Sequence, residues 1–247
     1  MEVFAPLHPV RLKRLKHYIA GMAGLILYYP MWSRSGLIER NMAPEYFTSD
    51  LYQGGITGAA LGQPGKVGTS FSFDGTDDNI DVTPLAAPLP LYPNNTAFSV
   101  AFLVRNTNTS QSARSIYSEG STAGDNPIYT LRTGSSNTAA LQFRVRNDAG
   151  GDLETSETSW TLAQGVWSSI VLTDNNGTVS IYKNGVASST NHNYTRGTIT
   201  NNIVYWGCLA RATPVNFFQG DLQHGALFNR AITATEALKI AQIAGTA

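Results

Sequence analysis

The stretch VWSSIVLTDNNGTVSIYKNGV, residues 166–186, decides the fold class. Apolar and polar residues alternate before and after the turn DNNG, residues 174–177, as they do in two strands joined by a short loop. A second turn follows at Asn184 and Gly185, two residue types that accept the positive φ angles of a type I′ hairpin turn. The stretch therefore predicts consecutive antiparallel strands.

Two further stretches show the period of a strand. The segment AFSVAFLVR, residues 97–105, is largely apolar on both faces, which indicates a strand that is buried on both sides. The segment LQFRVR, residues 141–146, is apolar on one face and carries Gln142, Arg144 and Arg146 on the other. One face of that strand therefore packs in a core and the other meets solvent.

One helix is predicted, near the C-terminus. Thr233 and Glu236 fit a capping box, in which each side chain accepts a hydrogen bond from a free backbone amide of the first turn. Apolar residues then follow at helical spacing, at Ala237, Ile240, Ala241 and Ala244. Residues 25–247 contain no evident linker, so we expect one nearly all-β domain.

Composition agrees with this class and excludes others. The 247 residues include 23 Gly and 11 Pro, and 14% are charged, which suits short strands joined by turns. The formal net charge is zero, so the chain as a whole has no electrostatic basis for binding nucleic acid. A single cysteine, Cys208, excludes an internal disulfide framework and a cysteine-rich zinc site. No apolar run reaches the length of a membrane span.

Residues 1–24 differ from the rest and are predicted to form a basic and apolar N-terminal arm. Apolar residues recur there at helical spacing beside cations, which favours an assembly arm whose apolar residues pack on a neighbouring subunit. Its cations would then meet an acidic surface. Binding of nucleic acid or lipid is the alternative, but so few cations give a modest electrostatic contribution. The residues of this arm are Arg11, Leu12, Lys13, Arg14, Leu15, Lys16 and Ile19.

Five blocks in order resemble the laminin G-like (concanavalin A-like lectin) jelly roll family, in its bacterial and phage form. They are LILYYPMW at 25–32, GKVGTSFSFDGTDDNIDV at 65–82, FSVAFLVR at 98–105, the stretch at 166–186, and FQGDLQHGALFNRAITATEALKIAQ at 218–242. The resemblance covers roughly residues 25–245. It implies a two-sheet antiparallel jelly roll sandwich over residues 25–247, with a short C-terminal helix. Gln223 and His224 depart from the family, which more often has an acidic residue there, and His224 is interpreted as a strand residue at the sandwich edge.

The resemblance also implies two kinds of site. Relatives often hold calcium at a sandwich edge, and the candidate carboxylates are Asp77, Asp78 and Asp125, for which exposed turn residues are the alternative interpretation. Glycan binding requires aromatic and planar polar side chains on a face or in loops. The candidates are Tyr129, Arg144, Arg146, Tyr194 and Arg211, although such arginines are more often ordinary solvated strand residues.

Catalysis is not expected. Glycoside hydrolases use paired carboxylates, and Asp152, Glu154 and Glu157 are the nearest approach to such a set. Asp152 and Glu154 are expected to share one face of a strand. Their order, D-x-E-x-x-E beside two glycines, departs from the E-x-D-x-x-E pattern of related endo-glucanases, and a solvated turn accounts for it.

The leading hypothesis is a non-catalytic structural protein on the surface of a virus particle, a phage above all. It would be a decoration, spike or tail-associated subunit that contacts other subunits and glycans, in an oligomer or lattice. The alternative is a secreted or cell-surface carbohydrate-binding or adhesion module, and a glycan hydrolase comes third.

Overall fold

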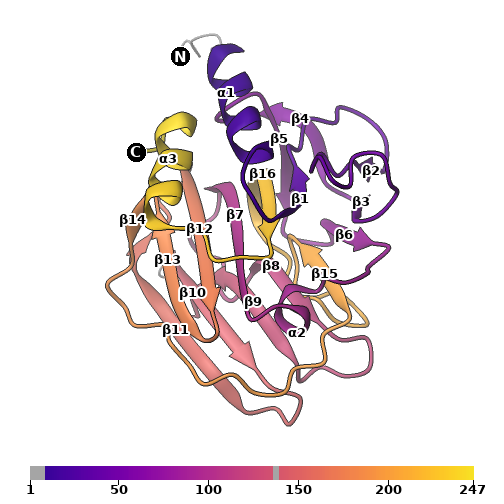
Figure 1. Ribbon diagram of the computed structural model, residues 1–247, viewed down its shortest axis with the longest axis vertical. Coiled ribbons are helices and arrows are strands. Elements are labelled where there is room, and N and C mark those ends of the chain that lie inside the picture. Colours follow the sequence, from indigo (N-terminus) through magenta and orange to yellow (C-terminus); the bar gives the residue numbers. More distant parts are fainter. Residues whose placement is uncertain (1–8, 136–138) are drawn as a thin grey trace.

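The computed structural model describes residues 9–135 and 139–247, and this part of the chain forms a sandwich of two eight-stranded antiparallel sheets (Figure 1). Sheet A consists of β1 (Leu25–Tyr29), β4 (Ala60–Pro64), β5 (Thr69–Asp74), β7 (Ala97–Asn106), β12 (Trp167–Asn175), β13 (Thr178–Lys183), β14 (Val186–Ala187) and β16 (Gln219–Phe228). Sheet B consists of β2 (Ile38–Glu39), β3 (Gln53–Thr57), β6 (Asn79–Thr83), β8 (Ser115–Gly120), β9 (Ile128–Thr133), β10 (Ala140–Arg146), β11 (Asp152–Thr161) and β15 (Ile203–Trp206). The helices are α1 (Pro9–Ala20), α2 (Leu91–Asn94) and α3 (Ala234–Ala244). The predicted all-β jelly roll sandwich with a C-terminal helix is confirmed.

The main core lies between the sheets. β7 contributes Phe98 and Phe102 from the centre of sheet A, and sheet B contributes Leu131, Phe143 and Trp206. Because side chains alternate along a strand, these inward residues fix which face of each strand points outward.

The outer face of sheet A is apolar as well, and helices cover part of it. Ala101 and Leu103 of β7 lie in a second buried cluster with Leu15 and Ile19 of α1 and with Ile240 of α3. The two helices lie next to each other at one end of the molecule (Figure 1). The prediction that β7 is buried on both faces is therefore correct, and the second face is buried by helices.

This packing corrects the predicted assembly arm. Leu15 and Ile19 are 0% and 1% exposed within their own chain, so they are not available to pack on a neighbouring subunit. Leu12 is half-buried in the same cluster, beside Gly68. The cationic side of α1 does remain outside, since Arg11, Lys13 and Arg14 are exposed and Lys16 is half-exposed. Residues 1–8 of the predicted arm lie outside the described residues.

The N-terminus of α3 is capped as the sequence predicted. Thr233 Oγ1 accepts a hydrogen bond from the Glu236 amide, and Glu236 Oε2 accepts one from the Thr233 amide, so the predicted capping box is present. Hydrogen bonds from Arg230 hold the pKa of Glu236 at about 2.

The predicted hairpin turn between β13 and β14 has φ angles of 53° at Asn184 and 82° at Gly185.

Gln223 and His224, which depart from the family pattern, lie at a bulge in β16. One edge of β16 pairs with β5 up to Leu222 and with β1 from Gly225, and on its other edge the register with β7 shifts between Gln223 and Ala226. His224 lies in that bulge with a φ of 53° and accepts or donates a 2.6 Å hydrogen bond between its Nδ1 and Tyr28 Oη. Gln223 binds the backbone of Val67, which closes the adjoining loop. His224 is 1% exposed, so its placement at the sandwich edge was wrong.

The role of α1 can be tested by stability. We expect Leu15→Ala to lower the free energy of unfolding by about 2 to 4 kcal/mol, because it leaves a cavity in a closed cluster. Urea denaturation measures this change. Lys13→Ala, on the exposed side of the same helix, is the matched control and should change stability by less than about 0.5 kcal/mol. Equal stability of the two variants would restore the interpretation of α1 as a free arm.

Candidate functional site

The outer face of sheet B is polar, in contrast to that of sheet A. On β9 the outward residues are Thr130 and Arg132, which alternate with the core residues Tyr129 and Leu131. On β10 they are Gln142, Arg144 and Arg146, as predicted from the alternation. The register places Arg132 opposite Gln142 and Thr130 opposite Arg144, so these side chains share one surface.

The segment 207–217 crosses this face over β8. Ser118 Oγ donates to the Cys208 carbonyl at 2.7 Å and accepts from the Ala210 amide at 2.8 Å. Gly120 permits the close approach, because a Cβ at that position would collide with the Ala210 carbonyl. The segment therefore delivers Arg211 to the same face as the arginines of β9 and β10.

Four guanidinium groups meet there, from Arg132, Arg144, Arg146 and Arg211. Arg144 holds Asp152 through Nε and Nη2, at 2.8 and 3.0 Å. Arg146 Nε donates to the Asn126 carbonyl at 2.7 Å, and its Nη2 donates to the Asp125 carbonyl. Arg211 Nε lies 3.6 Å from the Asp125 carboxylate. We call these four residues the arginine cluster.

The arginines of the cluster act on one another. The pKa of Arg132 is lowered to about 10, chiefly by burial, with the positive charges of Arg144 and Arg146 acting in the same direction and Asp152 opposing them. Burial also lowers the pKa of Arg146, with contributions from Arg144 and Arg211. These shifts show that the cluster is crowded with like charge and partly withdrawn from water.

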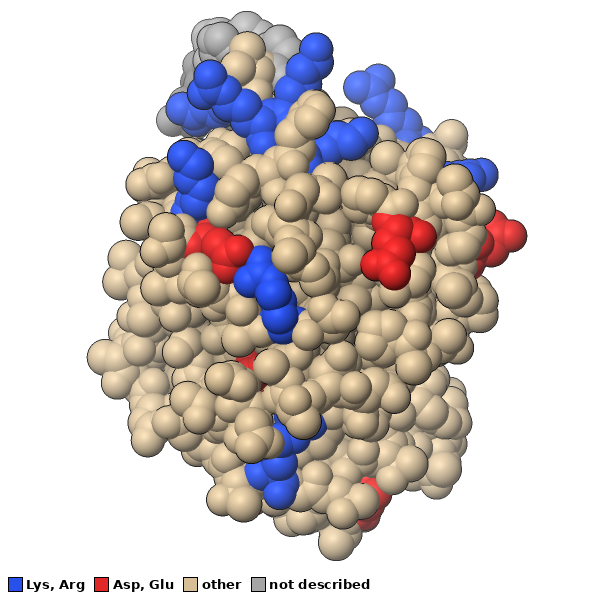
Figure 2. Space-filling model, viewed as in Figure 1, with Lys and Arg blue, Asp and Glu red and all other residues tan. Residues whose placement is uncertain are grey.

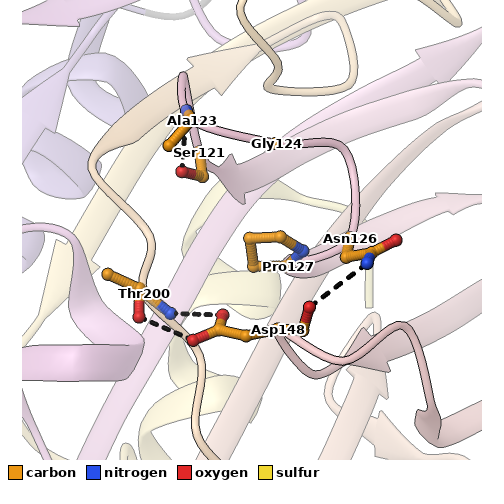
Figure 3. Close-up of a pocket in the computed structure, with 7 residues that line it drawn as sticks. All are labelled: Ser121, Ala123, Gly124, Asn126, Pro127, Asp148 and Thr200. Carbon is orange, nitrogen blue, oxygen red and sulfur yellow. Dashed lines mark hydrogen bonds between the residues drawn. The ribbon is translucent and has the colours of Figure 1, made fainter.

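A pocket of about 370 Å³ borders the cluster (Figure 3). It is lined by Ser121, Ala123, Gly124, Asn126, Pro127, Asp148 and Thr200. Asp148 accepts hydrogen bonds from the Thr200 amide at 2.8 Å and from its hydroxyl at 2.6 Å, which ties the two walls together. Because Arg146 donates to the carbonyl of Asn126, the pocket and the arginine cluster form one continuous polar surface.

The structure brings together three of the five predicted glycan-binding residues: Arg144, Arg146 and Arg211. The two tyrosines lie apart from these arginines, and for the fully buried Tyr129 the prediction was wrong. Tyr129 points into the core with 0% exposure, and Tyr194 is half-buried against Phe143. The hydroxyl groups of both tyrosines donate to Asp174 Oδ2, at 3.3 and 2.5 Å respectively.

Sequence reasoning missed Arg132, although the signal was present. The segment IYTLRT, residues 128–133, places Tyr129 and Leu131 on one face and Thr130 and Arg132 on the other. This is the same alternation that identified Arg144 and Arg146. The presence of Tyr129 on the apolar face of this strand also shows why it is a core residue.

Two carboxylates are enclosed between the sheets and serve the fold. Glu119 accepts hydrogen bonds from the amides of Leu91 and Tyr92 and from the Tyr117 hydroxyl. Asp174 accepts from the Gly177 amide as well as from the two tyrosines. Burial raises the pKa of both carboxyl groups, and the hydrogen bonds oppose that rise.

The predicted hydrolase-like carboxylates do not share a face. A register shift in the β10–β11 pairing places Asp152 opposite Arg146 and Glu154 opposite Val145. Since Arg146 points outward and Val145 points into the core, Asp152 and Glu154 lie on opposite faces of sheet B. The expectation that they share a face was wrong because it took the strand to be regular.

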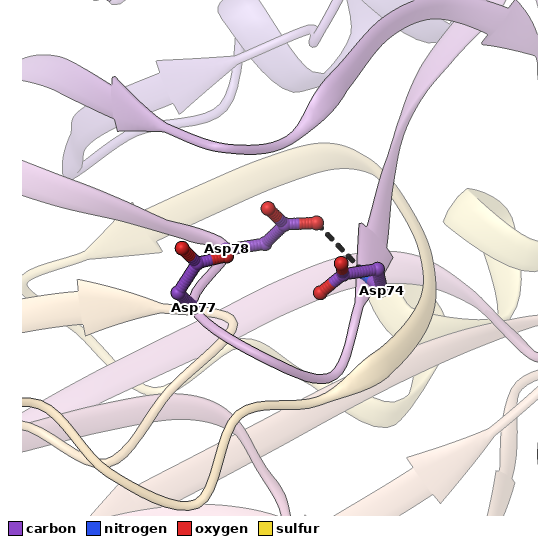
Figure 4. Close-up of side chains that lie close together, drawn as sticks. All are labelled: Asp74, Asp77 and Asp78. Carbon is purple, nitrogen blue, oxygen red and sulfur yellow. Dashed lines mark hydrogen bonds between the residues drawn. The ribbon is translucent and has the colours of Figure 1, made fainter.

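The calcium candidates separate into two places. Asp77 and Asp78 lie with Asp74 in the β5–β6 turn, with ligand oxygens within 4.8 Å of one another (Figure 4). Asp125 belongs instead to the arginine cluster, so it was wrongly grouped with them. Asp78 Oδ2 accepts from the Asp74 amide at 2.7 Å. Burial raises the pKa of Asp78, and the charges of Asp74 and Asp77 contribute.

Oxygen donors of this kind suit calcium, although part of the set already serves the turn. Calcium binding therefore remains a prediction: addition of 1 mM calcium after EDTA treatment should raise the melting temperature by about 3 °C or more. Asp77→Asn should abolish the shift, and Asp125→Asn, as the matched control, should preserve it. An unchanged melting temperature in the wild-type protein would contradict the prediction.

A second charged surface lies on the helices. Lysine and arginine side chains gather at the end of the molecule where α1 lies (Figure 2). A small pocket there is lined by Arg11, Arg14, Lys239, Gln242 and Ile243, from α1 and α3. None of the helices in the described ranges has the length and apolar character needed to cross a membrane.

Solved structures with the same architecture include Trypanosoma rangeli sialidase in complex with sialic acid. It matches with a TM-score of 0.66 at 16% identity, over 94% of this chain and 37% of the sialidase chain. Botulinum neurotoxin type C, whose cell entry depends on interaction with two ganglioside molecules, matches with a TM-score of 0.66 at 12% identity, over 93% of this chain and 53% of that chain. This chain thus spans only part of either protein, and at these identities the likeness shows the fold.

No sequence among the curated proteins gives a match to this chain. A family model described as the concanavalin A-like lectin/glucanases superfamily matches residues 74–237, which include the turn of the three aspartates, the arginine cluster and the capped start of α3. This match confirms the predicted family resemblance. The chain belongs to the concanavalin A-like lectin/glucanases superfamily.

Proposed function

We propose that this chain is a non-catalytic glycan-binding module, and that its site is the outer face of sheet B together with the adjoining pocket. The observation that carries the proposal is that the open pocket at Asn126 adjoins Arg146, which lies on the same outer face of sheet B as Arg132 and Gln142. Guanidinium and amide groups held at fixed positions are suited to the hydroxyl groups of a sugar. The lectin-like fold supports the proposal.

Several features support binding without hydrolysis. Glycosidases need two carboxyl groups on either side of the scissile bond, one of them able to donate a proton. Both oxygens of Asp152 accept hydrogen bonds from Arg144 in a bidentate pair, so this carboxylate is already engaged. Glu154 lies on the other face of the sheet. Within the described chain, the enclosed acids Glu119 and Asp174 are committed to backbone and tyrosine donors.

A glycan array followed by calorimetry tests this function. We expect saturable binding of at least one glycan by the wild-type protein, without release of reducing sugar. Gly124→Trp should abolish binding, because the space around a side chain at that position is open and the indole would fill the pocket without disturbing the fold. Lys13→Trp on α1 is the matched control and should bind like the wild type.

Failure of the wild-type protein to bind any glycan on the array would refute the proposed function. Normal binding by Gly124→Trp would move the site away from the pocket. Release of reducing sugar that Glu154→Gln abolishes would instead favour a hydrolase.

A second candidate function is that of a structural subunit on a particle such as a phage virion. The exposed cations Arg11, Lys13 and Arg14 on α1 favour it, because the sequence of this helix contains no acidic residue to neutralise them. Such a surface fits an acidic patch on another subunit. On this proposal the chain would lie on the virion surface, whereas the first candidate fits an extracellular module.

Charge reversal tests the second candidate better than deletion does, because deletion of α1 would also open the buried cluster around Leu15. The double variant Arg11→Glu and Arg14→Glu should fold normally and yet be lost from purified particles of the native source, measured by mass spectrometry. Retention of the variant at the wild-type level, or absence of the wild-type protein from such particles, would refute this candidate.

A further inference from the structure

The arginine cluster has a property that neutral sugars do not require. Four guanidinium groups gather on one face, and among the described residues their carboxylate partners are Asp152, held by Arg144, and Asp125, beside Arg211. Arg132 contacts neither carboxylate directly, and its Nε donates to the neutral amide oxygen of Gln142, at 2.8 Å. Like charges held together and partly desolvated repel one another until an anion joins them.

Arg132 is held in a fixed position and has donor groups available for a ligand. The residue is only 8% exposed, so its position is fixed by the surrounding sheet, and its hydrogen bond to Gln142 fixes the plane of the guanidinium. In the described part of the chain its two Nη groups have no hydrogen-bond partner, and neither is sealed from solvent. An arginine whose aliphatic chain is buried and whose Nη groups are accessible can bind an anion through two parallel hydrogen bonds.

The neighbouring groups shape the surroundings of Arg132. Arg144 on β10 is the diagonal neighbour of Arg132 on β9. Asp152 holds Arg144 in place, so the positive charge of Arg144 has a fixed position beside Arg132. Arg146 and Arg211 extend the positive surface toward the pocket at Asn126. A sugar in the pocket would therefore place a substituent near Arg132 only if it extended across the cluster, as part of an oligosaccharide.

We infer that the module selects acidic oligosaccharides, and that Arg132 binds their carboxylate or sulfate group through its Nη atoms. This inference rests on the proposed glycan-binding function and specifies the substrate class of the same site. The shared chemistry of the ligands is an anionic oxygen group on a sugar, and a carboxylate and a sulfate ester both satisfy it.

Calorimetry with paired ligands tests the inference. The acidic probes are 3′-sialyllactose for the carboxylate and a sulfated chondroitin disaccharide for the sulfate, and their neutral partners are lactose and the desulfated methyl ester of the same disaccharide. We expect at least one acidic probe to bind about 10- to 100-fold more tightly than its neutral partner, as a charge-assisted bidentate pair provides. The desulfated disaccharide with its uronate carboxylate left free then shows whether the sulfate or the carboxylate is recognised.

Two substitutions locate the effect. Arg132→Gln removes the charge and should reduce affinity for the acidic probe about 10- to 100-fold, and should reduce affinity for the neutral partner by much less. Arg132→Lys keeps the charge but loses the fork, so it should recover only part of the affinity. Arg14→Gln on α1 is the matched control and should bind as the wild type does. Melting temperatures establish that each variant is folded, and the wild-type comparison stands on its own should Arg132→Gln fail to fold.

The possible outcomes distinguish selectivity for acidic glycans from glycan binding in general. Equal binding of acidic and neutral probes by the wild type would refute the inference and leave glycan binding intact. Binding of acidic probes that Arg132→Gln does not weaken would refute the role of Arg132. Inhibition of acidic-probe binding by equimolar inorganic sulfate would show a general anion site only and would also refute the inference. Binding of no glycan at all would refute the proposed function itself.

Discussion

The burial of β7 on both faces is the constraint on which the rest of the structure depends. This strand crosses the centre of sheet A and carries phenylalanine and valine on one side and Ala101 and Leu103 on the other. Apolar area of this size stabilises the fold only when both sides are removed from water. Sheet B covers one side, and α1 with α3 covers the other, so the helices at opposite ends of the chain are drawn to the same surface.

That arrangement leaves the two outer faces unequal. The helices occupy part of sheet A, whereas on sheet B the segment 207–217 covers β8 and leaves Arg144 and Arg146 of β10 half-exposed. Polar residues are tolerated there because each is held by a partner on the same face, as Arg144 is by Asp152 and Arg132 by Gln142. The face that stability does not require for packing is the one that carries the candidate binding site.

The sequence predicted the parts of the fold that local chemistry determines. The Asn184–Gly185 turn, the capping box at Thr233 and the double-sided burial of β7 all follow from residue types at fixed spacing, and all are present. Alternation also identified the outward arginines of β10. These features depend on a few consecutive residues, so contacts with distant parts of the chain hardly affect them.

Features set by contacts between distant residues were not predictable in the same way. The helical spacing of Leu15 and Ile19 revealed an apolar face but not the surface that covers it, which belongs to the same chain. The bulges in β11 and β16 arise from pairing with neighbouring strands, and they altered the faces assigned to Glu154 and the position assigned to His224. Tyr129 was misassigned because aromatic residues serve both cores and binding sites.

The most direct test of the account is where an acidic glycan binds. Nuclear magnetic resonance of ¹⁵N-labelled protein can follow the Nε–Hε signals of individual arginines during titration with 3′-sialyllactose and, separately, with the sulfated chondroitin disaccharide. The account predicts saturable shifts at Arg132 and Arg144 with at least one of these probes, and none at Arg11 or Arg14. Shifts confined to Arg11 and Arg14, or no saturable shift at Arg132 with either probe, would contradict it.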